Sequence, residues 1–450
     1  MDRGIVPGMS SAVSGKGQGQ RHCRQVGWGG AGSTFVTSGE MMLLPTKILA
    51  GSVLSVCLLS SACAVEPELN ACRLDEVALS DAIARSEAWV DGYFSLVETL
   101  AGGEHHGTSV AVSACGQIVW QAGFGFADIE AQTPVTIDTL FRAGSVAKTL
   151  TSPLLVQAEA RGELDLDADI RTYFPAFPPK EHEFSTRQLA GHTAGIRHYW
   201  GDEFASNVAY ETVSDGLVIF QDDPLEFEPG TQYSYSSYGW NLLSAVVEGA
   251  TGRDYLELMQ TDVFDPAGMD STFAEGRADT PGGQVTYYLY DQEGQAMVVA
   301  PPVNNSIKWA SGGFVSTPTD LLRFGLAMED GTLVSPEAYE AMRETMHTAD
   351  GAATNYGLGW AIDMIPRQLQ RTAQIYSEED VARTTAIFDG MISYGHTGGS
   401  MGSTTVFLSA QDDDTTFTVA AMSNSGIGPA YAVSVLGEFV AASQAARAVE

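Results

Sequence analysis

Two stretches far apart in the sequence alternate apolar and polar side chains with a period of two. The first runs from Thr108 to Trp120 and contains a turn signal at Cys115-Gly116, so it predicts a hairpin of two strands. The second lies near the other end of the chain, at 404–409 and 415–422. Strands at both ends with helical patterns between them predict one sheet assembled from the two ends of the chain.

Helical periodicity fills much of the remaining sequence. Apolar residues recur at helical spacing over 66–100, at about 146–161, at 318–329 and at 429–446. We therefore expect an α/β (α+β) fold in which helices flank an antiparallel sheet, formed by residues 65–161 and 311–450.

Residues 162–310 differ from their flanks, because prolines and aromatic residues are dense there and no long strand pattern occurs. We expect a mainly helical domain over this range, and a loop or insertion at 365–390. The expected helical patches are 186–192, 206–221, 236–250 and 254–264.

The composition is strongly acidic. The 450 residues include 56 Asp and Glu against 23 Lys and Arg, which gives a formal net charge of −33. A nucleic-acid partner is therefore not expected, and anionic lipid surfaces are disfavoured. The length and the 44% hydrophobic content suit a globular protein with a large core.

The first 64 residues resemble a targeting region. Residues 1–40 are rich in Gly and Ser without periodicity, so we expect them to be non-native upstream sequence or disordered. Residues 41–64 combine a basic residue, a short apolar run and a small-residue end, which predicts a signal peptide. Two alternatives remain open, cleavage at Ala62-Cys63-Ala64 or lipidation of Cys63. The protein is accordingly expected to be periplasmic or secreted, or to touch the membrane only through a lipid anchor.

Processing at either point leaves two of the five cysteines, Cys72 and Cys115. In an exported protein these two can form a disulfide that joins the N-terminal segment to the first strand region. Two free thiols are the alternative. Neither cysteine has neighbours that predict a metal site, the pair His105-His106 has no acidic partner pattern, and no cofactor is expected.

Ser145 and Lys148 form the only Ser-x-x-Lys of the chain. Residues three apart on a helix share a face. The Lys148 amine can therefore take the proton of Ser145 Oγ, provided that burial keeps the amine neutral. Lysine is scarce, and after the targeting region only Lys148, Lys180 and Lys308 occur.

Two further segments have the composition of a catalytic site. In the first, a Pro229-Gly230 turn precedes a run of Tyr and Ser that includes Tyr235. The second, 394–400, contains glycines that let backbone N–H groups approach a bound acyl group. A formal Gly-x-Ser-x-Gly pattern surrounds Ser400, but that nucleophile needs a downstream histidine and none follows His396.

In this order, Ser145-Val-Ala-Lys148, Tyr235-Ser-Ser237 and His396-Thr-Gly-Gly399 resemble the motifs of the serine β-lactamase and penicillin-binding-protein superfamily. The closest branch is the class C β-lactamase-related hydrolases, which include family VIII esterases and DD-peptidases. The resemblance covers roughly residues 85–445. Further matching segments are Thr139–Ser145, Leu189–Gly195, Pro229–Thr231, Gly312–Phe314 and Tyr356–Trp360.

The resemblance implies a role for each motif. Ser145 would be the nucleophile, Lys148 its base or proton shuttle, and Tyr235 the acid that protonates the leaving group. The backbone N–H groups of Ser145 and Gly399 would form the oxyanion hole. The remaining motif residues would contact the substrate, and these are Ser237, His396, Thr397 and Gly398.

Two motif positions differ from the family pattern. Ser237 stands where the family usually has asparagine, so an amide that contacts the substrate is lost. His396 stands where β-lactamases usually have lysine, and a histidine is mostly neutral at pH 7. Both changes favour an esterase or a peptidase-like enzyme over an efficient β-lactamase.

We therefore expect an exported serine hydrolase that forms an acyl-enzyme on Ser145 and cleaves small esters or D-alanyl peptide or amide bonds. Two alternatives remain open: a penicillin-binding or sensor-type module that acylates without turnover, and a true class C-like β-lactamase. The expected partner is a small ester, peptide or β-lactam-like molecule.

Overall fold

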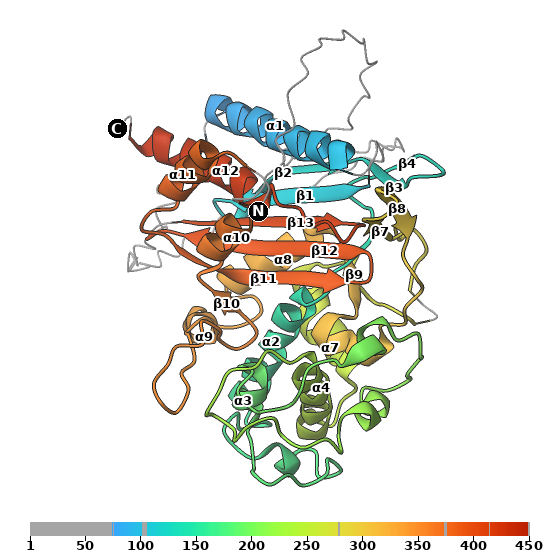
Figure 1. Ribbon diagram of the computed structural model, residues 1–450. Coiled ribbons are helices and arrows are strands. Elements are labelled where there is room, and N and C mark those ends of the chain that lie inside the picture. The colour runs from blue at the N-terminus through green and yellow to red at the C-terminus, as the bar shows by residue number, and fades with distance from the viewer. Residues whose placement is uncertain are drawn as a thin grey trace, which may run out of the picture.

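The computed structural model describes residues 74, 76–100, 106–277, 280–372, 376–413 and 415–448. Its main feature is a six-stranded sheet with the order β10-β11-β12-β13-β1-β2, in which all neighbours are antiparallel. Figure 1 shows α1 and α12 together on one side of this sheet, and α2 and α8 on the other. The predicted α/β class with a helix-flanked antiparallel sheet is confirmed.

The sheet joins the two ends of the chain as predicted. β1 (Thr108–Ala114) and β2 (Gln117–Phe124) form the expected hairpin. Cys115 and Gly116 in its turn have φ values of 55° and 71°, and a two-residue type I′ turn requires positive φ at both positions. β1 then pairs with β13 (Thr416–Ser423) from the far end of the chain.

The outer half of the sheet consists of β12 (Ser403–Gln411), β11 (Ile392–Ser400) and β10 (Ala361–Ile362). β10 pairs with only two residues of β11, Tyr394 and Gly395. The edge of β11 beyond that point, which carries the third motif, is therefore left without a neighbouring strand of this sheet.

Alternation along the strands creates two cores. In β1, Val110 and Val112 pack in the cluster under α1 (Glu76–Leu100) and α12 (Ala432–Arg447), whereas Ala111 faces the cluster of α2 (Val146–Ala160). This follows from the period of two in a strand. On the first face, the buried Glu438 carboxylate of α12 accepts hydrogen bonds from side chains of α1 and α11 (Glu378–Ile387), namely Arg85, Trp89 and Arg383.

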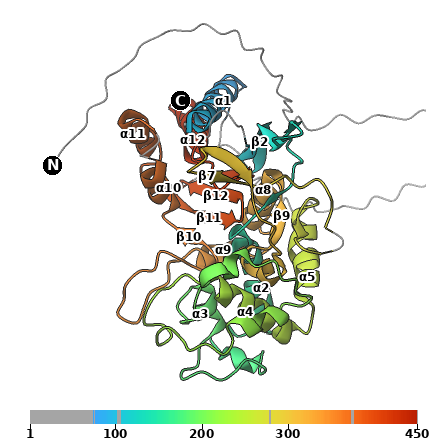
Figure 2. The same cartoon turned by 45° about the vertical axis from the view of Figure 1, so that its right-hand side comes forward.

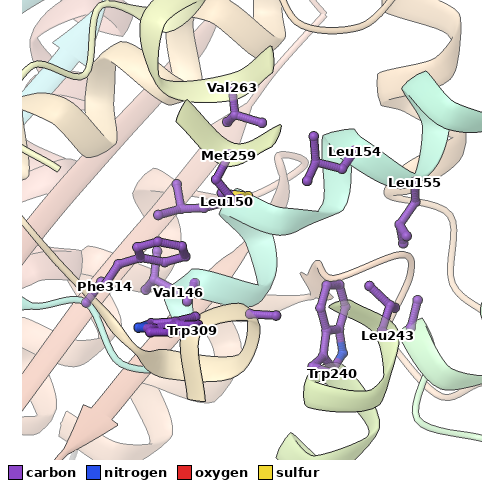
Figure 3. Close-up of a cluster of buried hydrophobic side chains, with 14 of the residues drawn as sticks. Val146, Leu150, Leu154, Leu155, Trp240, Leu243, Met259, Val263, Trp309 and Phe314 are labelled. Carbon is purple, nitrogen blue, oxygen red and sulfur yellow. The ribbon is translucent and has the colours of Figure 1, made fainter. Parts of the chain in front are cut away.

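The second core continues into the helical region below the sheet. Figure 3 shows Leu150 of α2 near Met259 of the π-helical turn Met259–Phe264, and Leu155 of α2 near Trp240 of α4 (Ser237–Thr251). One continuous apolar cluster therefore holds α2 against the residues that follow it.

The region 162–310 is mainly irregular with short helices, as far as it is described. The predicted helix at 206–221 is wrong except for a 3-10 turn at Asp215–Ile219. Polar side chains bind the backbone of this segment instead, for example Asp215 on Thr212 N and Ser306 on Tyr210 N, and such bonds compete with a helix. Three short strands were also not predicted, and the domain division at 162 and 310 stays a prediction.

The expected loop at 365–390 contains α10 (Met364–Thr372) and α11, so that expectation is wrong in its secondary structure. Ser377 caps α11 by accepting from Asp380 N at 3.1 Å, a helix-start signal that the sequence contained. In Figure 2, α10 stands beside β10 and β11 at one side of the sheet.

The remaining described elements complete the chain. The strands are β3 (Phe126–Asp128), β4 (Thr133–Pro134), β5 (Phe141–Arg142), β6 (Phe273–Ala274), β7 (Tyr288–Asp291), β8 (Ala296–Val299) and β9 (Phe314–Ser316). The α-helices are α3 (Thr186–Ala190), α5 (Tyr255–Leu258), α6 (Asp265–Ala267), α7 (Trp309–Gly312), α8 (Pro318–Glu329) and α9 (Pro336–Met342). The further 3-10 turns are Ile170–Thr172, Gly201–Ala205 and Ser306–Lys308.

The predicted targeting region, with Cys63, lies outside the described residues, and so does Cys72. Cys115 is disulfide-bonded, but the pairing with Cys72 stays a prediction. Within the described part of the chain, no helix has both the length and the apolar content needed to cross a membrane.

Candidate active site

Ser145 lies where β5 ends and α2 begins. It occupies the N-cap of α2, but its side chain makes no capping hydrogen bond. Its Oγ instead lies 3.2 Å from Lys148 Nζ and lines a cavity of about 420 Å³. A serine that does not cap its own helix has its hydroxyl available for chemistry.

Lys148 is fully buried on the next turn of α2. Its Nζ donates to the carbonyl oxygen of Ser311 at 2.7 Å and lies 3.1 Å from Ser237 Oγ. None of these partners is a carboxylate, so nothing in this hydrogen-bonding shell compensates a positive charge. Burial holds the pKa of Lys148 well below its usual 10.5, which favours the neutral amine that a base must be.

Tyr235 stands beside this pair, with its ring centroid 4.9 Å from Lys148 Nζ. Burial raises its pKa, and hydrogen bonds to the side chains of Ser145 and Ser237 oppose the rise. Tyr235 therefore keeps its proton at neutral pH. Of the two groups near Ser145, Lys148 is the better base and Tyr235 the better acid.

Two histidines hold the backbone of the second motif. Ser236 N donates to His192 Nδ1 and Ser237 N donates to His198 Nδ1, each at 3.1 Å. Both Nδ1 atoms act as acceptors, so in the neutral rings the proton sits on Nε2. Ser236 Oγ then accepts from Gly239 N at 2.9 Å and starts α4. His192 belongs to the matching segment Leu189–Gly195, whereas His198 was not identified from the sequence.

The third motif lies directly against the backbone of Ser145. A Cβ atom at Gly398 would come within 2.0 Å of Ala143 O, and one at Gly144 within 2.6 Å of Gly399 N. Only glycine permits this approach, and Gly144 also has a φ of 52°. The contact brings the N–H-bearing segments of Ser145 and Gly399 to one place, as an oxyanion hole requires.

A buried ion pair supports this contact from behind. Arg142 Nη2 lies 2.7 Å from Glu275 Oε1, and Arg142 Nη1 donates to Met401 O at 2.7 Å. Because Arg142 precedes Ser145 by three residues and Met401 follows Gly399 by two, the ion pair fixes the two segments relative to each other.

His396 is buried and hydrogen-bonded on both ring nitrogens. Its Nδ1 lies 2.6 Å from Thr397 O and its Nε2 lies 2.9 Å from the hydroxyl of Tyr356. Since a carbonyl oxygen only accepts, Nδ1 carries the proton and Nε2 accepts from Tyr356. Burial and the nearby Lys148 lower the pKa of His396 to about 3. The third motif therefore presents a neutral ring to the site.

The cavity brings most of the predicted residues together. Its wall includes Ser145, Tyr235, Ser237, His396, Thr397 and Gly399. Lys148 lies buried behind Ser145, and Gly398 faces the backbone of Ala143 instead of the cavity. Ser400 also reaches the cavity, but the side chain that contacts its Oγ is the amide of Asn305, at 3.3 Å, which cannot serve as a base. Within the described part of the chain, no group of three or more His, Cys, Asp or Glu residues is placed to hold a metal ion.

Four basic side chains of the cavity wall were not predicted as site residues. His198, Lys308, Arg367 and Arg371 line the wall but belong to none of the three motifs. His198 follows the matching segment Leu189–Gly195 by three residues. The two arginines lie in the stretch expected to be a loop. They are four residues apart, a spacing that places both side chains on one face only if the stretch is a helix.

Comparisons with known proteins agree with this geometry. The family model described as Beta-lactamase matches residues 95–436. The human "Serine beta-lactamase-like protein LACTB, mitochondrial" is 33% identical over 291 residues, which cover 49% of this chain and 53% of the human protein. The "D-aminopeptidase" of Gluconobacter oxydans (strain 621H) is 31% identical over 263 residues, which cover 56% of this chain and 48% of that enzyme.

The chain thus spans about half the length of these two relatives. Among solved structures, the "octameric penicillin-binding protein homologue from Pyrococcus abyssi" superposes with a TM-score of 0.62 at 21% identity, covering 81% of this chain and 77% of that one. At this identity the structural match supports the fold alone.

Proposed function

The chain belongs to the beta-lactamase family, a family of serine hydrolases, and we propose that it is an exported enzyme that cleaves small esters or D-alanyl amide bonds through an acyl-enzyme on Ser145. The observation that carries the proposal is the buried, carboxylate-free environment of Lys148, whose Nζ lies 3.2 Å from Ser145 Oγ. The signal-like pattern in 41–64 supports export.

Acylation follows from the protonation states of the site. The neutral Lys148 amine takes the proton of Ser145 as Oγ attacks the substrate carbonyl. The backbone N–H groups of Ser145 and Gly399 stabilise the negative charge that develops on the carbonyl oxygen. Tyr235 donates its proton to the leaving group and recovers one from Lys148, so the site returns to its charge state with the acyl group on Ser145. A water molecule then repeats the sequence on the acyl-enzyme.

Two features support an ester or peptide substrate over a β-lactam. Ser237 provides a hydroxyl where the family usually has an amide, and that hydroxyl is already within 3.1 Å of Lys148 Nζ. His396 is neutral because burial lowers its pKa to about 3. Neither residue supplies the amide or the fixed charge that would hold the carbonyl and the carboxylate of a β-lactam.

The test compares the two serines of the cavity. The wild type should hydrolyse p-nitrophenyl acetate and gain the mass of one acyl group. Ser145→Ala should lose both properties, whereas Ser400→Ala should retain both. A D-Ala-D-Ala peptide and nitrocefin complete the panel. Activity that survives Ser145→Ala and is lost in Ser400→Ala would refute the assignment. A burst of acylation without steady turnover would show that the protein is a non-turnover binding module. Fast nitrocefin hydrolysis would show that it is a β-lactamase.

A further inference from the structure

The charged side chains on the cavity wall are all positive, whereas the net charge of the protein is negative. Three charged side chains line the described cavity, Lys308, Arg367 and Arg371, and no Asp or Glu does. Acidic residues outnumber basic ones 56 to 23 in the whole sequence, so three cations without a carboxylate are not what the composition leads one to expect. A site on such an acidic protein needs local positive charge to retain an anion.

Two of these cations stand on one face of α10. Met364, Arg367, Gln368 and Arg371 are spaced i, i+3, i+4 and i+7, which places them on one side of the helix, and all four line the cavity. Met364 and Gln368 are buried while both arginines are exposed. The arginines thus belong to the rim of the cavity, while the fully buried Lys148 lies at its floor.

Helix α10 is attached to the strand that carries the third motif. Asp363 N donates to Ser393 O at 2.8 Å, and Ile365 N donates to Ser393 Oγ at 3.1 Å. The start of the helix is therefore fixed relative to β11. Among the described residues, neither Arg367 nor Arg371 forms an ion pair with a carboxylate, so both guanidinium groups are available to a ligand.

The arginines line the same cavity as the segment that carries the proposed leaving-group acid Tyr235. Burial raises the pKa of Tyr233 and the positive charge of Arg367 lowers it, and Tyr233 precedes Tyr235 by two residues. β10, just before α10, pairs with Gly395, the neighbour of His396. Lys308 lies elsewhere, since its Nζ donates to Asn305 Oδ1 at 3.2 Å and Asn305 contacts Ser400, beyond Gly399.

We infer that the substrate carries a negatively charged group, in the simplest case a carboxylate, on its leaving group and away from the scissile bond, and that Arg367 and Arg371 bind it. This inference rests on the proposed function. A guanidinium binds a carboxylate through two parallel hydrogen bonds. The neutral His396 offers no charge to a carboxylate beside the scissile bond. Lys308 Nζ already donates to Phe204 O and Asn305 Oδ1, so the two arginines of the rim are the better place for a carboxylate in the described cavity.

The experiment uses two pairs of esters with matched shape. 4-Acetoxyphenylacetate and its neutral amide differ only in the charge on the leaving group. Phenyl hydrogen adipate and its terminal amide differ only in the charge on the acyl group. For the wild type, kcat/KM should favour the anionic member of the first pair by about tenfold or more, as a charge-assisted contact allows. The double variant Arg367→Gln/Arg371→Gln should lose this preference and hydrolyse the neutral amide as the wild type does.

Two controls separate charge from structure. Arg171→Gln removes the same charge at an exposed position outside the cavity wall and should keep the preference. Arg367→Lys/Arg371→Lys keeps both charges and should retain most of it.

Three outcomes would overturn the inference while Ser145-dependent hydrolysis of the neutral esters leaves the proposed function intact. These are a wild type without the preference, a glutamine variant that loses both substrates equally, and a preference confined to the acyl pair. Hydrolysis that persists in Ser145→Ala would remove the proposed function and the inference together.

Discussion

The floor and the rim of the cavity are built on opposite electrostatic principles. At the floor, Lys148 and His396 are buried and Tyr235 is half-buried, and desolvation shifts the pKa of each in the direction that favours its neutral form. At the rim, Arg367 and Arg371 are exposed cationic side chains. The floor therefore moves protons without holding a net charge, and the rim holds charge without moving protons.

This difference separates chemistry from recognition. A lysine base works only when it is neutral, and burial without a carboxylate achieves that. A fixed charge in the third motif would lie in the same buried space and would oppose any proton on Lys148. With a neutral His396 and the positive charge of Arg367 and Arg371 at the rim, that conflict is absent.

The strongest test of the floor is Lys148→Met, which keeps an unbranched apolar chain of similar length. We expect kcat/KM on p-nitrophenyl acetate to fall by about a thousandfold, within the range of a lost general base. The pKa of Lys148 is lower in the folded than in the unfolded chain, so between these two pKa values the unfolded state binds more protons and stability rises with pH. At neutral pH the Lys148 amine therefore lowers the free energy of unfolding. The thermal midpoint of Lys148→Met should not fall below that of the wild type.

Lys180→Met is the matched control, because Lys180 is bonded to backbone carbonyls of Gln221 and Asp223 and does not line the cavity. It should leave kcat/KM unchanged. Full activity in Lys148→Met would show that the floor does not need an amine, and the contrast between floor and rim would fail.

The pH profile tests whether the floor is neutral. The value of kcat/KM for a neutral ester should rise as Lys148 loses its proton, with a midpoint well below 10.5. It should decline only above pH 10, because burial raises the pKa of Tyr235. His192, His198 and His396 all have lowered pKa values, so none of these three histidines should add an inflection near 6.5. A limb near 6.5 that disappears in a His396 variant would contradict a permanently neutral third motif.

The floor was largely predictable from the sequence, and the rim was not. Ser145 and Lys148 are three residues apart on one helix, and that spacing alone places them together. The glycines of the third motif predict a close backbone contact, and the structure shows this contact between Gly398 and Ala143. The catalytic roles of Ser145, Lys148 and the third motif stay predictions that rest on the resemblance and on this geometry.

Tertiary packing decides the parts that the sequence did not reveal. Arg367 and Arg371 line the cavity only because β10 and Ser393 fix the start of α10 against β11. Likewise, the helix expected at 206–221 is replaced by turns in which polar side chains bind the backbone. Local periodicity contains no information about the contact of Ser393 with Ile365 or of Ser306 with Tyr210, because these partners lie 28 and 96 residues apart. The bond between Asp215 and Thr212 is local, but it depends on side-chain chemistry and not on periodicity.

The smallest effect is expected at His198, a half-buried residue of the cavity wall. Its Nδ1 accepts from Ser237 N, so His198→Ala should lower kcat about tenfold, the worth of one hydrogen bond that positions the motif. His198→Asn places an amide oxygen near the Nδ1 position and should restore most of that loss. Burial and Lys148 lower the pKa of His198 to about 4, so the wild type should also lose activity as pH falls through about 4, where a second ring proton would face the N–H of Ser237. Equal defects in the alanine and asparagine variants would show that the ring acts through its contacts with Tyr199 or Tyr235. His198 would then support the site by packing and not through its hydrogen bond to Ser237 N.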